Sequence, residues 1–448
     1  MLNISQAEAR AGALIDRAKR AGADAADALY FGEASTGLQV RLGEIEDVSR
    51  SEGEEVGLRV FVGARSASVS SSDLSDEALS ALVERAVAMA REAPEDPYSG
   101  LAPEDRLMRG DPVDVDGDDG QDPTPTEIKA RALAVEDAAR SVAGITNSEG
   151  AGVSAGRTII ALATSHGFCR GYSTSGYSAS VAVIAGEGGE MQRDYAHHST
   201  RHYSDLDDPE TLGRLAAERT LARLRPAKVP SGAMPVVYDP RVGSSLITHL
   251  IGAVSGPSIT RRTSFLLEKE GEAIFGPSIT IRDDPHRSRG LGSKPFDGEG
   301  LPTRPSDLVA EGRITGWLLE TASARQLGRE PTGHATRGAS GAPSVGATNV
   351  HMEPGRLSAE ALIGEVERGV YVTELIGQGV NPVTGDYSRG ASGFIIENGK
   401  LGPAVAEITI AGNLLDMFRT LTPASDLEFR RSTNVPTLRV DGMTIAGA

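Results

Sequence analysis

The 448-residue chain is predicted to adopt an α+β fold, with an N-terminal helix/antiparallel-sheet domain followed by a β-rich C-terminal domain. The length exceeds what one hydrophobic core usually serves, so two domains are expected. Glycine is abundant, at 53 residues, and aromatic residues make up only 4% of the chain, which is typical of many turns and hairpins around an aliphatic core. Helical and alternating patterns also follow one another in the first half, as in an α+β layer.

The first 70 residues are expected to form a helix followed by an antiparallel meander. Small and apolar residues recur at helical spacing from the candidate N-cap Ser5 to Gly22. Residues 28–70 instead alternate between apolar and polar side chains, as half-buried strands do. Glycine recurs in this stretch at intervals of ten residues, at Gly43, Gly53 and Gly63. This spacing predicts short antiparallel strands joined by turns.

A second helix is expected to lead into an acidic, proline-rich loop. The helical pattern begins at Ser75 and ends at Ala93, and residues 94–125 then contain six prolines and almost no apolar period. An aspartate-rich run inside this loop is similar to a calcium-binding loop. Its sixth and twelfth positions, however, are Asp119 and Pro125, where such a loop needs Gly and Glu. A solvated loop or linker is therefore the preferred interpretation.

The remainder of the N-terminal domain, residues 1–225, is expected to combine helices and strands. Helical patterns at 126–141 and 208–224 flank two β-rich runs, at 157–164 and 177–184. These elements can extend the layer that the first two helices begin.

A second domain, residues 226–448, is expected after the proline-bounded segment 226–230. Glycine-punctuated strand patterns dominate it, with helical patterns near 240–253, 358–368 and 412–419. The glycine-rich run 328–346, which carries His334 and Arg337, is long for a structureless loop. It is interpreted either as a mobile connector or as a loop that faces a peptide or a partner.

Composition and charge argue against several functional classes. The net charge is −17, from 62 acidic and 45 basic side chains, and no basic stripe offsets it, so nucleic acid is not an expected partner. Nowhere do 18 apolar residues run together, and the N-terminus lacks a signal-peptide pattern, so no membrane association is expected. The single cysteine, Cys169, cannot form an intramolecular disulfide, which favours a structural thiol in a cytoplasmic protein.

Several common catalytic signatures do not occur in the sequence. None of the eight histidines is followed by glutamate, and there is no G-x-G-x-x-G turn or P-loop. His198 and His202 stand four residues apart, which on a helix is a metal-binding spacing. No carboxylate lies between them, however, and residues 192–195 look like the end of a strand. A polar surface cluster is preferred there over a metal site.

The predicted helix at 240–253 is the most informative segment. Asp239 is a good N-cap and Pro240 suits the first helical position. An apolar stripe follows at helical spacing: Val242, Leu246, Leu250 and Ala253. His249 lies at the edge of this stripe, and its simplest interpretation is a structural histidine with one hydrogen bond.

Several segments, in the right order, resemble the TldD/PmbA peptidase family ("modulator of DNA gyrase") and specifically its PmbA (TldE) branch. They are residues 192–195, 283–285, 297–303, 348–355, 377–394 and 408–414. In the helix, Thr248 stands where the catalytic branch has the first His of an HExxxH zinc motif. His249 stands at its Glu and Ala253 at its second His, while Gly252 is retained. No cysteine follows Cys169 to supply the C-terminal ligand of that branch.

The resemblance implies a non-catalytic subunit with no catalytic residue, metal or cofactor of its own. Threonine and alanine offer neither a zinc ligand nor a general base. Residues five apart on a straight helix are also separated by about 140° of rotation, so an HExxxH pair can bind one ion only if the helix bends. Gly252 would still allow such a bend, but Thr248 and Ala253 offer no side chain that could coordinate an ion.

The expected partner is a TldD-like zinc peptidase, with which this chain would cut peptides and unfolded segments. Its C-terminal domain would form the interface, and a homodimer is a further possibility. Two other functions stay open. One is an independent hydrolase that uses His198 and His202 with a metal, and the other is a binding protein that regulates DNA gyrase without proteolysis.

Overall fold

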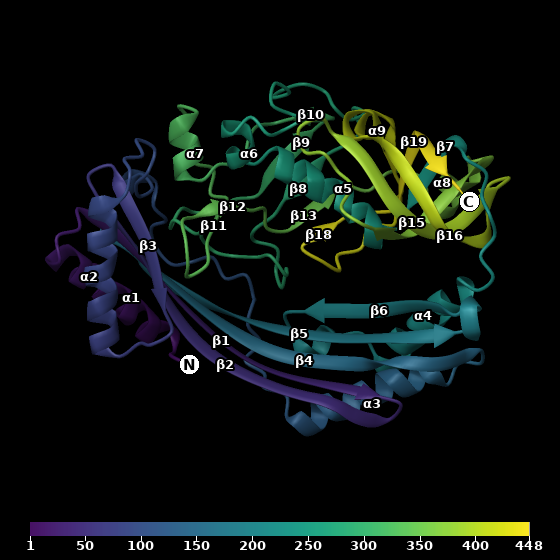
Figure 1. The fold of residues 1–448 in the computed structure, drawn as a ribbon, viewed down its shortest axis with the longest axis horizontal. Coiled ribbons are helices and arrows are strands. Elements are labelled where there is room, and N and C mark those ends of the chain that lie inside the picture. The colour runs from purple at the N-terminus through teal and green to yellow at the C-terminus, as the bar shows by residue number, and fades with distance from the viewer. Residues whose placement is uncertain (448) are drawn as a thin grey trace.

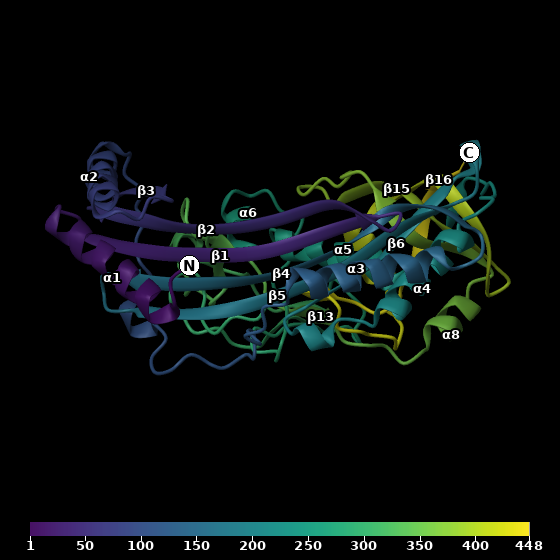
Figure 2. The same cartoon turned by 90° about the horizontal axis from the view of Figure 1, so that it is seen from below.

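The computed structural model describes residues 1–447 and confirms the α+β fold class. Its N-terminal region is built on one long, curved, antiparallel sheet, and its C-terminal region lies over one face of that sheet (Figure 1). Figure 2 shows the same sheet from below, with strands that run along much of the molecule. The strand order is β3–β2–β1–β4–β5–β6, and the strands are β1 (Ala25–Arg41), β2 (Glu44–Val62), β3 (Arg65–Ser71), β4 (Ile145–Thr164), β5 (Cys169–Ala185) and β6 (Gln192–Thr200).

Four helices cover the face of the sheet that turns away from the C-terminal region: α1 (Ile4–Arg20), α2 (Asp76–Glu92), α3 (Pro125–Arg140) and α4 (Pro209–Ala222). Alternate residues of β1 separate the two sides, as the pleat of a strand requires. Ala28 and Tyr30 pack with α1 and α2, whereas Leu29 packs in a separate cluster with Phe296 of the C-terminal region. The two faces of the sheet therefore contribute to two hydrophobic cores, one under the helices and one against the C-terminal region.

The start of α1 differs from the prediction by two residues. The N-cap is Asn3 rather than Ser5, because Asn3 and Gln6 exchange hydrogen bonds between side chain and backbone at 2.9 and 3.0 Å. This reciprocal pair satisfies two backbone donors, and Ser5, two residues later, already lies inside the helix. The predicted cap of α2 is confirmed, since the Ser75 hydroxyl accepts the backbone N–H of Ala78 at 3.3 Å.

The predicted short strands at 28–70 are wrong in length. Gly43 and Gly63 do lie in turns, with φ of 84° and 57°, but Gly53 lies inside β2, opposite Glu33 of β1. An extended backbone accepts glycine without a break, so glycine spacing alone does not mark a turn. Residues 192–195 were likewise misplaced, because they begin β6 rather than end a strand.

Before α3 begins at Pro125, the acidic segment contains one short 3-10 helix, Glu104–Arg106, and otherwise no regular element, as predicted. It is nevertheless attached at several points. The Asp116 carboxylate accepts a hydrogen bond from Arg289 at 2.6 Å, and Asp118 pairs with Arg157 at 2.7 Å. Since Arg289 belongs to the C-terminal region, this segment ties the two regions together rather than acting as a free linker.

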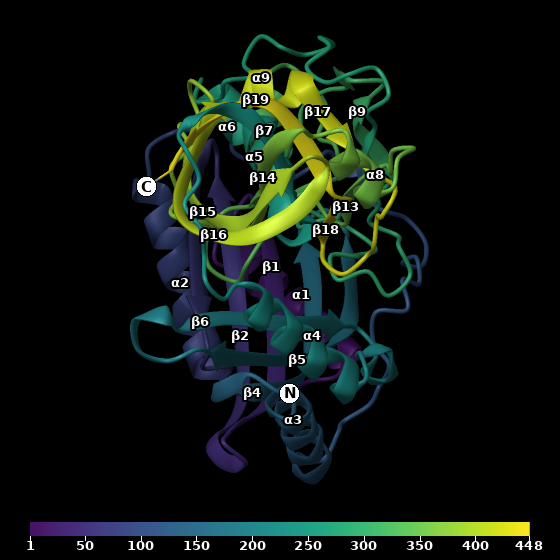
Figure 3. The same cartoon turned by 90° about the vertical axis from the view of Figure 1, so that its right-hand side faces the viewer.

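A closed five-stranded barrel forms the centre of the C-terminal region and is seen end-on in Figure 3. Its strands are β7 (Gly232–Tyr238), β14 (Arg368–Ile376), β15 (Asp386–Glu397), β16 (Lys400–Asn413) and β19 (Leu438–Ala446). Pairing of β16 with β19 closes the ring, and β17 (Leu421–Pro423) extends β19. The helices α5 (Pro240–Ala253) and α9 (Leu414–Thr420) belong to the same core, close to their predicted positions.

Smaller elements complete this region. A five-stranded sheet contains β8 (Ile281–Asp283), β9 (Ser306–Ala310), β10 (Arg313–Ile314), β13 (Val350–Met352) and β18 (Thr433–Asn434). The short helices are α6 (Gly256–Thr260), α7 (Thr321–Gln326) and α8 (Ala359–Gly364). The helix predicted at 358–368 ends early, because β14 already begins at Arg368. No helix within residues 1–447 is both long and apolar enough to cross a membrane.

Candidate functional site: the altered metal helix and its cleft

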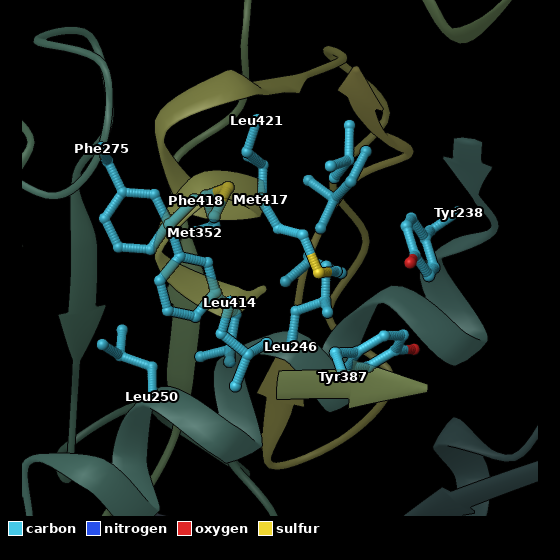
Figure 4. Packing of buried hydrophobic residues seen from close by; sticks show 14 of the residues in the cluster. Tyr238, Leu246, Leu250, Phe275, Met352, Tyr387, Leu414, Met417, Phe418 and Leu421 are labelled. Atoms are coloured by element: carbon cyan, nitrogen blue, oxygen red, sulfur yellow. The ribbon is translucent and has the colours of Figure 1, made fainter. Parts of the chain in front are cut away.

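The helix that the sequence singled out is present as α5. The Asp239 carboxylate accepts the backbone N–H of Arg241 at 2.9 Å, and Pro240 occupies the first helical position, as predicted. Its buried face packs against strand and helix residues from far along the chain (Figure 4). The fully buried residues of this face are Leu246, Ile247 and Leu250. Packing therefore determines the orientation of α5, and with it the positions of the altered motif.

The altered motif residues lie on different sides of a regular helix. Thr248 is exposed, and its hydroxyl donates to the backbone carbonyl of Ser244 at 3.2 Å, whereas Ala253 is buried. Gly252 is exposed, and a Cβ at that position would meet no atom within 4 Å. α5 runs through Gly252 without interruption. Two side chains at positions 248 and 253 would consequently point away from each other.

His249 differs from the expected structural histidine. Its Nε2 atom is buried and has no hydrogen-bond partner among residues 1–447. The ring packs edge-on against Tyr387, with 6.3 Å between the ring centres. Burial and the nearby positive charge of Arg389 both lower the pKa of His249. His249 therefore favours its neutral form in a cationic environment.

The side chains around α5 do not fit zinc. Within residues 1–447, no three His, Cys, Asp or Glu side chains come together as a metal site requires. Thr248 and Ala253 contribute no ligand, and the unpartnered nitrogen of His249 is one donor where a stable site needs three or four.

His198 and His202 do not form a helical pair. His198 lies in β6, where its Nδ1 is 3.2 Å from a carboxylate oxygen of Asp207, and His202 follows the strand, with Nε2 3.1 Å from Asp116. In a strand, residues four apart are widely separated, so the metal spacing of a helix does not apply. Each ring is instead paired with a different acidic residue.

Cys169 begins β5 and is half-buried. Its thiol lies 3.5 Å from the carbonyl oxygen of Glu8, and burial raises the pKa of the thiol. A raised pKa disfavours the reactive thiolate, so the structure agrees with a structural role.

A cavity of about 360 Å³ lies beside the polar side of α5, between β6 of the N-terminal region and β14 and β15 of the barrel. From α5 it is lined by Ser244, Ser245 and Thr248. Its charged lining residues are Asp194, Arg223, Arg241, Glu374, Arg389 and Arg431. No motif in the sequence marks these arginines. Only Arg389 lies in a segment that carries the resemblance, and the cluster has no signal along the chain because its members are far apart in sequence.

Asp194 connects the two regions at this cavity. Its carboxylate accepts hydrogen bonds from Arg241 at 2.8 and 3.1 Å and lies 3.5 Å from Arg223. Arg223 also pairs with Glu374 of β14. Burial alone would raise the pKa of Asp194, but the bonds from Arg241 and the charge of Arg223 lower it overall. Asp194 is consequently ionised and holds α5 against β6.

A second cavity, of about 420 Å³, lies next to the first and shares Tyr195, Arg241 and Arg431 with it. Its lining holds four acidic residues and four arginines, and Arg430 pairs with Asp207 at 2.5 Å. The two cavities together form a cleft between the regions, with α5 along one wall.

The segments that carried the resemblance at 283–285, 297–303 and 348–355 build a buried polar network. Asp283 accepts the backbone N–H of Thr348 at 3.0 Å. Asp297 accepts the N–H groups of Glu299 and Leu301, both at 2.9 Å. These acidic side chains satisfy backbone donors inside the fold, so they act as scaffold.

The glycine-rich segment 328–346 is packed against the N-terminal sheet rather than free. It contains the two-stranded sheet β11 (Ala335–Thr336) and β12 (Ser344–Val345). Between these strands the buried side chain of Arg337 pairs with Asp27 of β1. The interpretation as a mobile connector is therefore wrong, and a role towards a peptide or partner stays a prediction.

Comparison with known proteins finds relatives that match nearly the whole chain. Family models described as PmbA/TldA metallopeptidase domain 1, central domain and C-terminal domain match residues 26–90, 118–224 and 231–447. The Metalloprotease PmbA of Escherichia coli O157:H7 is 40% identical, over 92% of this chain and 90% of that protein.

Solved structures of similar proteins have the same fold. A putative modulator of DNA gyrase from Bacteroides thetaiotaomicron superposes with a TM-score of 0.92 at 28% identity, over the full length of both chains. TldE from Thermococcus kodakarensis shares the fold, with a TM-score of 0.88 at 22% identity, over 98% of this chain and 100% of that one. From the sequence matches and the shared architecture together, the chain belongs to the PmbA/TldD metallopeptidase family.

Proposed function

We propose that this chain is a non-catalytic subunit that pairs with a zinc-bearing member of the same family to process peptides and unfolded segments. The donor set around α5 carries the proposal: the positions of the two histidine ligands hold an exposed threonine and a buried alanine. Without ligands or a general base, α5 cannot activate a water molecule. The metalloprotease activity in the name of the PmbA relative would then require a second chain.

The same geometry supports a retained substrate-facing role. α5 is intact, correctly capped and packed, and its polar side lines a cleft between the two regions. A scaffold that is kept while its ligands are replaced is expected when the surface, rather than the metal, is used. The cleft wall can align a peptide that the partner cleaves.

The test combines metal analysis with reconstitution. Zinc per chain, measured by elemental mass spectrometry after dialysis against a weak chelator, is expected to be near zero. Peptidase activity on a flexible peptide is expected only after a homologue with an intact HExxxH motif is added. Near-stoichiometric zinc, or full activity of this chain alone, would contradict the proposal.

A second candidate is a binding protein that acts on DNA gyrase without proteolysis, favoured by the similarity to the putative modulator of DNA gyrase from Bacteroides thetaiotaomicron. A pull-down from the native host distinguishes the two. Retention of the zinc-bearing homologue favours the subunit, and retention of gyrase alone favours the regulator.

A further inference from the structure

We propose that the cavity beside Thr248 binds the carboxylate group of an extended peptide, held by Arg389 and Arg431. The site is assigned from the residues that meet there, and it deepens the proposed function, because it names the part of a peptide that this chain would recognise.

Charge balance is the first argument. The cavity is lined by more arginines than carboxylates, and the carboxylates of Asp194 and Glu374 are both already paired with Arg223 or Arg241. Arg389 and Arg431 have no carboxylate within 4 Å among residues 1–447; each donates only to a backbone carbonyl, of Ile376 and Arg241 respectively. Two uncompensated guanidinium groups in one cavity are a carboxylate-binding arrangement.

The burial of Arg389 strengthens this argument. Only 9% of the residue is exposed, and its charge contributes to the lowered pKa of His249 next to it. A buried cation without a counter-ion is costly, and an anionic ligand removes that cost. Surface arginines would carry no such implication.

The free edge of β14 is a second, independent observation. β7 pairs with β14 only at residues 370–372 and then turns into α5, so residues 373–376 of β14 have no strand on that side. Thr373, Glu374 and Leu375 of this stretch line the cavity. An extended peptide can add to such an edge through backbone hydrogen bonds. Its end or a side-chain carboxylate would then reach the arginines.

The rest of the lining fits a peptide better than a bare anion. Val242 and Leu375 provide apolar surface, and the hydroxyl of Ser244 is free to donate. A volume of about 360 Å³ accommodates a residue side chain together with the charged group. The combination favours a carboxylate carried on a partly apolar body.

Calorimetric titration of the full chain at low salt tests the site with three acetylated peptides. The first is trileucine with a free C-terminal carboxylate, the second is its C-terminal amide, and the third is an amide with glutamate as the middle residue. At least one of the carboxylate-bearing peptides is expected to bind about tenfold more tightly than the neutral amide. Which one does so tells whether a terminal or a side-chain carboxylate is recognised. Equal binding of all three, or none, overturns the proposal.

Variants locate the binding. Arg389→Gln and Arg431→Gln are each expected to weaken binding of the preferred peptide about tenfold, and Arg389→Lys is expected to retain part of it. Arg368→Gln, an exposed position at the other end of β14, is the matched control and should leave binding unchanged. If Arg389→Gln does not fold, Ser244→Glu tests the site instead. Ser244 lines the cavity, so a glutamate there should pair with the arginines and abolish peptide binding. Unchanged binding in a folded Ser244→Glu variant would contradict the site.

The outcome is separable from the proposed subunit role. Reconstitution with a zinc-bearing homologue can succeed in chains that fail the peptide titration, in which case only the carboxylate site is wrong. Failure of reconstitution with intact peptide binding would reject the subunit role and leave the site.

Discussion

Glu299 shows at the scale of one residue how burial changes acid–base behaviour. Only 5% of the residue is exposed, and its carboxylate accepts the backbone N–H and hydroxyl of Thr321 at 2.9 and 2.7 Å. Burial and the neighbouring charge of Asp297 raise the pKa of Glu299 to about 7. A folded pKa above the unfolded value of 4.5 means that the folded state keeps a proton that the unfolded state loses. The associated stability is fully present below pH 4.5 and is lost as pH rises through about 7.

We expect Glu299→Gln to reduce this pH dependence, because glutamine keeps an acceptor for Thr321 without a titratable charge. The loss of unfolding free energy between about pH 5 and about pH 8.5 should fall by up to about 3 kcal/mol. Urea denaturation at both pH values measures it. Glu84→Gln, at an exposed position of α2, should leave the dependence unchanged. A variant with the pH dependence of the wild type would show that Glu299 does not titrate in this range.

At the scale of a structural element, the segment 328–346 shows how a loop is held in place by residues that are distant in the sequence. The side chain of Arg337 is 1% exposed and reaches Asp27, which also pairs with Arg59 of β2. On the other side, the backbone of Ala339 packs directly onto Gly57 of β2. A charge pair and a close backbone contact therefore hold the same segment.

Removing the arginine is expected to be costly. Arg337→Ala leaves the buried Asp27 with one partner instead of two, which should lower the free energy of unfolding by about 3–5 kcal/mol. Chemical denaturation measures this, with Arg304→Ala at an exposed position as control. Asp27→Asn should cost more than Arg337→Ala, because it removes the counter-charge of the buried Arg59 and of Arg337 at once. A loss in Arg337→Ala no larger than in the Arg304→Ala control would argue against the ion pair as the cause.

The close contact gives a second prediction for the same segment. A Cβ on Gly57 would overlap the carbonyl of Ala339, whereas a Cβ on Gly53 of the same strand would meet nothing within 4 Å. Gly57→Ala should therefore release segment 328–346 and expose it to limited proteolysis, and Gly53→Ala should not. Cleavage at equal rates in both variants would contradict the packing of this segment on β2.

For the molecule as a whole, the important feature is that charged pairs join the two regions around the cleft. Asp194 of β6 holds Arg241 of α5, and Arg223 of the N-terminal region pairs with Glu374 of β14. Asp194 is 2% exposed, so these charges are shielded from solvent screening. The position of α5 relative to the sheet depends on them.

We expect Asp194→Asn to destabilise the protein by about 3–5 kcal/mol, because the buried Arg241 side chain loses its nearest carboxylate and keeps only Asp239, at 3.8 Å. Since the folded pKa of Asp194 is lowered, its contribution is present above the unfolded value of 3.8 and is lost as pH falls further. Denaturation at neutral pH and in acid measures both effects, and the variant should lose less stability in acid than the wild type. Asp416→Asn, at an exposed site on α9, is the control. No loss at neutral pH would indicate that another contact positions α5.

The sequence alone determined the fold class, most helices and the capped start of α5. These features are local, because helical and strand periodicity, capping residues and motif spacing each involve residues that are close together in the sequence. Tertiary structure decided the long strands through Gly53, the docking of Arg337 and the meeting of Arg389 with Arg431. Those arginines come from different strands and loops, and only the closure of the barrel against α5 brings their charges into one cavity. Periodicity carries no information about such contacts, because it reports which face of an element is buried and not what lies opposite.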